Sequence, residues 1–244
     1  MKKNLLILGS SGLLGRQLSE LFKAQYDVIG HLNKKSYYSK NIKQIKFDIF
    51  NSKDLFKVLK KYKPKIVINA TGIANVEKCE KEKKYAYKIN VKINDLFSSL
   101  SNKFNFKFVT ISTDHLFGNI KKEKFSEKDK TDALNYYAET KILAEKIVMR
   151  NSKKSLIIRT NFFGKGYYYR KSFSDHIIEN LQNNKKIYLF KNVYFNPVII
   201  SKLHRVLSIL IKKNISGILN VCSNEKISKY KFGKLIAKKF KLNT

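Results

Sequence analysis

The sequence contains few cysteines and no long apolar run, and both absences narrow the kind of protein it can be. Among 244 residues there are only two cysteines, Cys79 and Cys222, and they show no metal-ligand spacing. We therefore expect neither a disulfide framework nor a metal site, and a reducing, cytoplasmic setting. No stretch approaches the about 20 apolar residues of a membrane span. The apolar run at residues 5–8 leads into glycines rather than a signal-peptide cleavage site.

Acidic residues are also scarce. The chain has 51 Lys and Arg against 18 Asp and Glu, a formal net charge of +33. Such a charge is typical of proteins that bind nucleic acid or anionic surfaces, but it can also reflect a compositional bias towards Lys, Asn, Ile, Phe and Tyr. The lysines are scattered singly or in pairs between apolar residues and form no basic tail. This pattern favours the bias, so we expect no nucleic-acid partner.

Short apolar runs alternate with amphipathic stretches as far as residue 160. They predict strands at residues 5–8, 26–29, 45–47, 66–70, 106–112 and 156–159, and helices at 13–23, 52–61, 85–100 and 135–149. This alternation predicts an α/β fold, a Rossmann-type doubly wound parallel sheet with helices on both faces. Beyond residue 160 the alternation loosens, with helices expected at 173–181, 203–211 and 229–240 and a strand at 218–221. We therefore divide the chain into residues 1–160 and a smaller region, 161–244.

A glycine-rich segment joins the first predicted strand to the first helix. It reads Gly9-Ser10-Ser11-Gly12-Leu13-Leu14-Gly15. Gly9 permits a tight turn, Gly12 lets a pyrophosphate approach the backbone, and Gly15 lets the helix pack closely on the strand. The free N–H groups at the helix start favour phosphate. Residues 1–160 are therefore predicted to bind NAD(P).

The residues after the second predicted strand bear on the choice of cofactor. An NAD site usually has an acid there, whereas this chain has Asn33, Lys34 and Lys35. The pattern favours the 2′-phosphate of NADPH and leaves NADH as the alternative.

Tyr137 and Lys141 stand four residues apart in the predicted helix at 135–149, so both lie on one helix face. A nearby ammonium lowers the pKa of a phenol, which can then act as an acid or base at a carbonyl. The alternative is a pair of exposed helix residues. Ser112 and Thr113 favour the chemical interpretation, because they end a central strand at the edge of the sheet where ligands bind.

Seven segments, in this order, carry a resemblance to a known family. They are Gly9-x-x-Gly12-x-x-Gly15, Phe47-Asp48-Ile49, residues 69–80, Ile89-Asn90-Val91, residues 112–118, Tyr137-x-x-x-Lys141 and residues 159–164. The chain resembles the extended short-chain dehydrogenases/reductases, and within them the dTDP-4-dehydrorhamnose reductases. The resemblance implies an NADPH-dependent oxidoreductase that reduces a nucleotide-activated 4-keto-6-deoxy sugar for polysaccharide synthesis. An epimerase or dehydratase of the same superfamily, and a non-catalytic NADP-binding regulatory subunit, remain alternatives.

The resemblance also implies roles for individual residues. Tyr137 would donate the proton, Lys141 would hold the cofactor ribose and lower the Tyr137 pKa, and Thr113 would hydrogen-bond the substrate carbonyl. The implied cofactor-binding set is Gly9, Ser11, Gly12, Leu13, Gly15, Asp48, Ile49, Ala70, Thr71, Gly72, Asn90, Tyr137 and Lys141; the substrate set is Thr113, Asp114 and Phe162. Alternatively, Asn90 only pins backbone groups, Asp114 caps a turn, and Phe162 is a core residue.

The region 161–244 would bind the nucleotide sugar. Its basic residues Lys165, Arg170 and Lys171 are candidates to receive the substrate pyrophosphate. Relatives continue beyond the position of Thr244, so this region is expected to be C-terminally incomplete. A homodimer is left open, and no membrane partner is expected.

Overall fold

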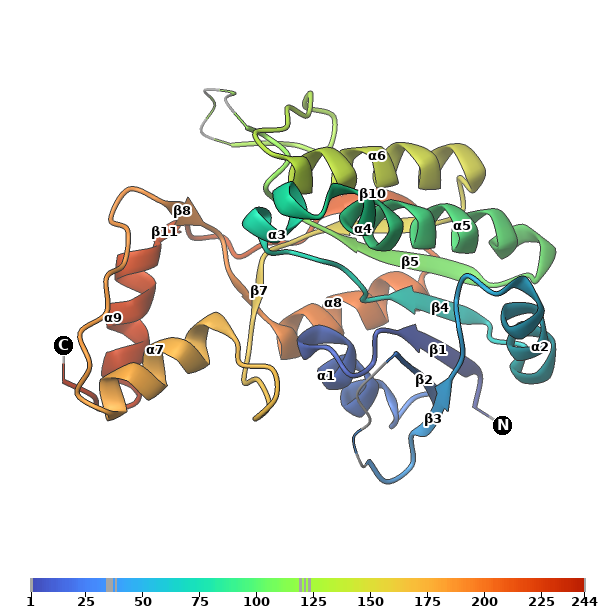
Figure 1. Ribbon diagram of the computed structural model, residues 1–244, viewed down its shortest axis with the longest axis horizontal. Coiled ribbons are helices and arrows are strands. Elements are labelled where there is room, and N and C mark those ends of the chain that lie inside the picture. The colour runs from blue at the N-terminus through green and yellow to red at the C-terminus, as the bar shows by residue number, and fades with distance from the viewer. Residues whose placement is uncertain are drawn as a thin grey trace.

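The computed structural model describes residues 2–33, 37, 39–118, 120, 122 and 124–243. A sheet of seven parallel strands lies at its centre, in the order β10-β6-β5-β4-β1-β2-β3 (Figure 1). The strands are β1 (Asn4–Leu8), β2 (Asp27–Leu32), β3 (Lys43–Lys46), β4 (Ile66–Asn69), β5 (Lys107–Ser112), β6 (Leu156–Arg159) and β10 (Gly217–Asn220). The strand order reverses between β1 and β4, the place where open α/β sheets bind ligands. The predicted Rossmann-type fold is confirmed.

Helices cover both faces of this sheet, because successive strand residues point to opposite sides. On one face Leu5 and Ile7 pack against α1 (Leu13–Phe22) and α8 (Ile200–Lys212). On the other face Leu6 and Leu8 pack against α2 (Ser52–Tyr62), α5 (Ile93–Lys103) and α6 (Tyr136–Asn151). Both cores are almost fully buried. The glycine-rich segment and the strand ends therefore sit on a rigid base.

The helix expected at 85–100 is divided in the structure. It consists of α4 (Lys83–Tyr87), a π-helical turn η1 (Lys88–Lys92) and α5, and a further helix α3 (Val76–Lys81) precedes it. Such π-turns occur often at functional sites because they redirect one side chain. Here the turn contains Asn90, which is buried.

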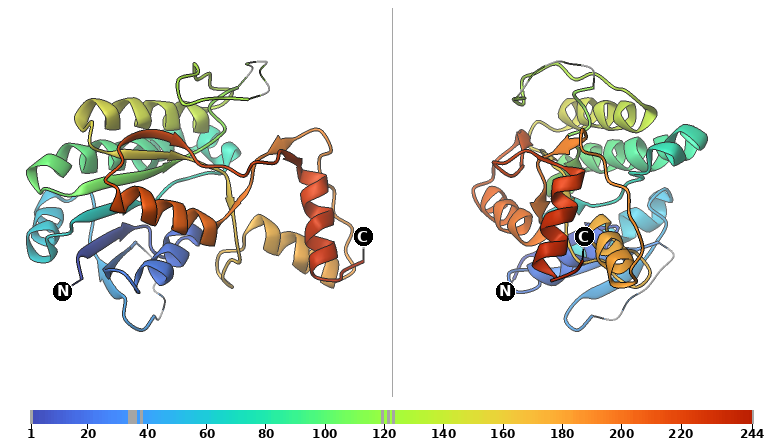
Figure 2. Two further views of the ribbon diagram at one scale, coloured as in Figure 1. Left: turned by 180° about the vertical axis from the view of Figure 1, so that it is seen from behind. Right: turned by 90° about the vertical axis from the view of Figure 1, so that its left-hand side faces the viewer.

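The last part of the chain forms a lobe beyond one end of the sheet, seen at the left of Figure 1 and again from behind in Figure 2. It contains α7 (Phe173–Gln182), α9 (Lys229–Lys239) and the antiparallel pair β8 (Tyr194–Phe195) and β11 (Ile227–Ser228). The parallel pair β7 (Phe162–Phe163) and β9 (Val198–Ile199) leads to this lobe and back. We call α7, α9, β8, β11 and their connections the lobe.

The sheet layer draws on both predicted regions of the chain. The helix α8 packs on α1, and β10 pairs with β6 at the edge of the sheet. Residues 161–244 thus supply the lobe and also close the sheet. The division at residue 160 stays a prediction about the organisation of the chain.

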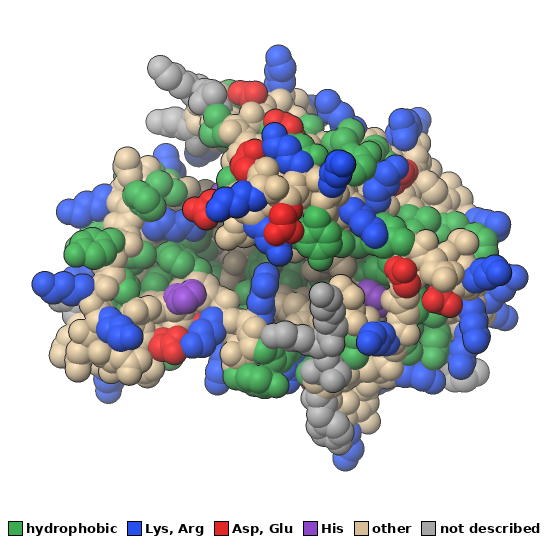
Figure 3. Space-filling view, in the orientation of Figure 1, with side chains coloured by type: hydrophobic (Ala, Val, Ile, Leu, Met, Phe, Trp, Pro, Cys, Tyr) green, Lys and Arg blue, Asp and Glu red, His purple; other side chains and the backbone are tan. Residues whose placement is uncertain are grey.

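Basic side chains cover the visible face without gathering into one band (Figure 3). This distribution agrees with the scattered lysines of the sequence. In the described part of the chain, no helix has both the length and the apolar character to cross a bilayer. The same residues contain no group of three His, Cys, Asp or Glu side chains placed to hold a metal ion.

Candidate functional site

The glycine-rich segment forms the turn between β1 and α1. Gly9 has a φ of +73°, a left-handed conformation that side chains disfavour. A Cβ at Gly15 would lie 2.2 Å from the carbonyl oxygen of Gly9, so only glycine lets α1 approach the strand this closely. Gly12 caps α1 without a side-chain acceptor, which leaves the first N–H groups of the helix free for an anion.

A cleft of about 940 Å³ opens beside this turn. Eight of the predicted cofactor residues line it, namely Gly9, Ser11, Gly12, Asp48, Ile49, Ala70, Thr71 and Gly72. Leu13 and Gly15 lie behind the cleft in α1. The cleft therefore unites the turn after β1 with the segments that follow β3 and β4.

Further residues outside the predicted cofactor-binding set also line the cleft. They include His31, Asn33, Lys46, Phe50, Tyr85, Lys88 and Arg170. Asn33 follows β2 directly, and its place after a strand was a usable signal. Lys34 and Lys35, on which the expected 2′-phosphate contact rested, lie outside the described residues.

The His31 ring is held in one orientation at the floor of the cleft. Its Nε2 lies 3.1 Å from the carbonyl oxygen of Phe47, and its ring meets the Phe47 ring edge-on at 4.6 Å. Burial lowers the pKa of His31, so the ring is neutral near pH 7. A neutral ring whose Nε2 donates to a carbonyl has an acceptor at Nδ1. That Nδ1 is buried and has no hydrogen-bond partner among the described residues.

Tyr137 lies at the start of α6 beside Thr113, the first residue after β5. Burial raises the pKa of Tyr137 to about 12, the Thr113 hydroxyl lowers it, and Asp114 and Cys79 raise it further. The phenol is therefore neutral throughout the physiological range. The expectation that Lys141 lowers this pKa is not met, because burial dominates.

The Lys141 side chain points to the strand β5. Its Nζ donates to the carbonyl oxygen of Ile111 at 2.6 Å. Burial lowers the pKa of Lys141 to about 8, and the Glu145 carboxylate one turn further along α6 opposes this shift. The ammonium and the phenol are thus fixed on one helix face, as their spacing predicted, although the ammonium bonds the strand rather than the phenol.

A buried ion pair between Arg159 and Glu145 fixes α6, the helix that carries Tyr137 and Lys141, against the sheet. Arg159 at the end of β6 donates to both carboxylate oxygens of Glu145, with Nη2 at 2.7 Å. The Ser112 hydroxyl donates to the same carboxylate. Glu145 thereby joins α6, which carries Tyr137 and Lys141, to β6 and to β5, which Thr113 directly follows. No pattern in the sequence indicates this pair, since Glu145 looks like an ordinary charged helix residue.

Asn90 connects the cleft with the region of Tyr137. Its amide accepts from the backbone N–H of Ile73 at 2.8 Å and donates to the Ile73 carbonyl and the Thr140 hydroxyl, both at 3.1 Å. Asn90 does not line the cleft. In this structure it pins backbone and helix, the alternative we had left open. Ile73 lies at the end of the cleft nearest α6.

Asp114 contacts the segment between β6 and β7. Its carboxylate accepts from Nδ2 of Asn161, with both distances 3.2 Å. The Lys229 ammonium lies on the lobe side, 3.5 Å from the centroid of the Phe195 ring. Burial lowers the pKa of Lys229, and Asp114 opposes the shift. Phe162 packs against the core beneath α1 and α8, which agrees with its alternative interpretation as a core residue.

The basic residues after β7 have separate surroundings. Lys171 pairs with Glu179 of α7 at 2.6 Å, whereas Arg170 lines the cleft beside the glycine turn. The centroid of the His115 ring lies 6.3 Å from that of the Tyr137 ring, with the two planes nearly perpendicular.

Comparison with known proteins places this site in a family. A family model described as the RmlD substrate binding domain matches residues 2–244. The chain belongs to this family. A dTDP-4-dehydrorhamnose reductase of Aggregatibacter actinomycetemcomitans is 29% identical over 160 residues, which is 65% of this chain and 51% of that protein. The chain thus aligns with about half the length of this RmlD relative.

Two solved structures of RmlD relatives have the same fold. A hypothetical dTDP-4-dehydrorhamnose reductase from Sulfolobus tokodaii is 31% identical, with a TM-score of 0.87 over 99% of this chain and 84% of that one. The Bacillus anthracis dTDP-4-dehydrorhamnose reductase in complex with NADP is 26% identical, also with a TM-score of 0.87, over 100% of this chain and 83% of that one.

Proposed function

We propose that the chain is an NADPH-dependent reductase of a nucleotide-activated 4-keto-6-deoxy sugar, with dTDP-4-dehydrorhamnose as its substrate. One observation carries the proposal: Thr113, which follows the carboxyl end of β5, meets Tyr137 on α6, the helix that also carries Lys141. Asn90 ties this helix to Ile73, which lines the cleft at the glycine turn. The family relatives named as dTDP-4-dehydrorhamnose reductases support the choice of substrate.

The cleft fits a dinucleotide on two independent grounds. The glycine turn leaves a space that a Cβ at Gly9 or Gly12 would narrow, since each such atom would lie within 3.1 Å of a neighbour. At the cleft floor, Nδ1 of His31 is a buried acceptor without a partner, and an adenosine hydroxyl could satisfy it. The NADP-bound relative from Bacillus anthracis supports NADPH, with NADH as the alternative.

The proposed roles follow from the surroundings of each residue. When bound, NADPH supplies a hydride to the sugar carbonyl carbon. Tyr137, kept neutral by its raised pKa, donates the proton to the carbonyl oxygen. Thr113 orients the phenol and the carbonyl, and Asp114 with Asn161 lies on the side from which the sugar enters. Lys141 holds the cofactor side of the site, supported by Glu145.

Turnover with a labelled cofactor tests the proposal. The protein is mixed with NADPH that carries deuterium on the transferred position, and with dTDP-4-dehydrorhamnose. Deuterium at the sugar C4 of a dTDP-rhamnose product is the expected result. Binding of NADPH without its oxidation would contradict the proposed reductase activity and favour the alternative of a non-catalytic regulatory subunit. Turnover with other keto sugars but not with dTDP-4-dehydrorhamnose would show that the proposed substrate is wrong while the reductase activity stands.

A further inference from the structure

The segment after β7 turns back over the glycine turn through a tight hairpin. The N–H of Tyr167 donates to the Arg170 carbonyl at 3.0 Å, and the N–H of Arg170 donates to the Tyr167 carbonyl at 2.8 Å. Gly166 begins the hairpin, and a Cβ there would lie 2.4 Å from the Arg170 carbonyl oxygen. The Gly166 N–H donates to Asp175 of α7 at 2.7 Å. The hairpin therefore has a fixed conformation and a fixed base.

The hairpin is also attached to the first turn of α1. The Arg16 guanidinium lies 3.7 Å from the centroid of the Tyr167 ring, and its Nη1 donates to the Tyr169 hydroxyl at 3.1 Å. From the next residue, Nε2 of Gln17 donates to the Lys165 carbonyl at 2.6 Å. Arg16 directly follows Gly15, so these contacts join the hairpin to the helix whose N-terminus faces the cleft.

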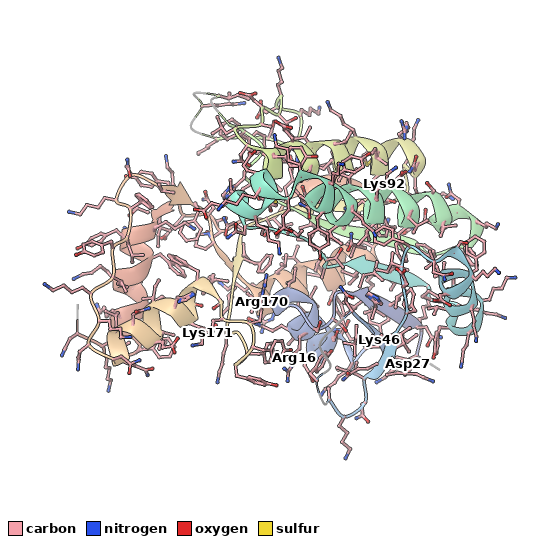
Figure 4. All side chains as sticks on the ribbon, in the orientation of Figure 1. Arg16, Asp27, Lys46, Lys92, Arg170 and Lys171 are labelled. Atoms are coloured by element: carbon pink, nitrogen blue, oxygen red, sulfur yellow. The ribbon has the colours of Figure 1, made fainter. Side chains whose placement is uncertain are left out.

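Arg170 is the cation that the hairpin brings to the cleft. It lines the cleft together with Gly9, Ser11 and Gly12. Figure 4 shows Arg16 and Arg170 together beside α1. Across the described residues, the Arg170 guanidinium has neither an ion pair nor a hydrogen bond, whereas the neighbouring Lys171 is neutralised by Glu179. An exposed guanidinium with five free donors beside free helix N–H groups fits a pyrophosphate, which carries one negative charge on each of its two phosphate groups.

We infer that residues 167–170 form a clasp that covers the pyrophosphate of the dinucleotide, with Arg170 as the binding residue and Arg16 as its anchor. The inference deepens the proposed function and rests on its dinucleotide site. It assigns Arg170 to the cofactor, not to the substrate pyrophosphate that we first considered.

The dissociation constants of NADPH and NADH at low salt test the clasp. Arg170→Ala should raise both by about tenfold, since a charged hydrogen bond to phosphate at an exposed site is lost. Arg170→Lys, which keeps the charge but loses the planar fork, should give a smaller rise. Arg205→Ala removes an exposed arginine of α8 and should leave both constants within about twofold.

Each other result is decisive. An effect confined to NADPH would move Arg170 to the 2′-phosphate and overturn the pyrophosphate assignment. Unchanged binding of both cofactors by Arg170→Ala would overturn the clasp while leaving the proposed function intact. If the unaltered protein bound neither cofactor, the proposed function itself would fail. Arg16→Ala should raise both constants less than Arg170→Ala, because it only loosens the hairpin.

Discussion

The sheet and the lobe differ in how they are stabilised, although both contribute to one site. The sheet buries aromatic residues completely, as Phe97 at 0% and Phe108 at 1% exposure show. The lobe has only a small core around Phe232, and it leaves Tyr188 92% and Phe190 68% exposed. The cleft and Tyr137 thus rest on the tightly packed sheet, whereas Lys229, which faces Asp114, belongs to the lightly packed lobe. Cofactor binding and substrate binding should therefore respond separately to mutation.

Removing a buried carboxylate from the sheet should destabilise the protein more than removing an exposed carboxylate from the lobe. Glu145→Ala leaves Arg159 buried without its partner, which typically costs about 3–5 kcal/mol. Urea unfolding measures the loss. In the lobe, Glu179→Ala breaks the exposed pair with Lys171 and should lower the urea midpoint far less. Equal losses would remove the distinction between the two halves.

A cavity in the lobe core should separate the two binding functions. Phe232 contacts Phe163, Phe173 and Phe195 with ring centroids 5.1 to 5.8 Å apart. Phe232→Ala should cost about 3 kcal/mol of local stability in the lobe. We expect the KM for the sugar nucleotide to rise while the Kd of NADPH stays within about twofold. A parallel loss of NADPH binding would mean that the lobe and the sheet unfold as one unit.

The pH dependence of kcat/KM should report Lys141 in the sheet half. Its pKa is lowered to about 8, so the ammonium is present below that pH and is lost as the pH rises through it. The rate should therefore fall about tenfold per pH unit above 8. Glu145→Gln removes a group that raises this pKa and should shift the fall to lower pH. A flat profile well above pH 8 would show that the ammonium is not required.

The difference in packing between the sheet and the lobe also explains which parts of the fold could be predicted from the sequence. Apolar runs such as residues 5–8 and 156–159 predicted the central strands because they are buried on both faces. The lobe is joined by two-residue strands such as Tyr194–Phe195, which are too short to show a periodicity. The glycine turn and the strand ends could be found from local patterns. The sequence offered Arg170 for the substrate pyrophosphate, but its place in the cleft depends on contacts that Arg16 and Gln17 make across 148 or more residues, which no local pattern indicates.

The direction of the Lys141 side chain likewise could not be predicted from the sequence. The four-residue spacing placed Tyr137 and Lys141 on one face of α6, and the structure has them there. The bond from Lys141 to Ile111 and the buried Glu145–Arg159 pair depend on how β5 and β6 meet the helix. The expected lowering of the Tyr137 pKa failed for the same reason, because the degree of burial is a property of the packed fold.

The central claim is that the Tyr137 phenol donates the proton in a reduction, and two adjacent tyrosines allow a direct test. Single-turnover oxidation of NADPH with dTDP-4-dehydrorhamnose is compared for Tyr137→Phe and for the matched control Tyr136→Phe, whose ring contacts Lys83 at the surface. We predict a loss of about 100-fold or more for Tyr137→Phe, with unchanged NADPH binding, and near-normal rates for Tyr136→Phe. Equal rates for the two variants would contradict the account.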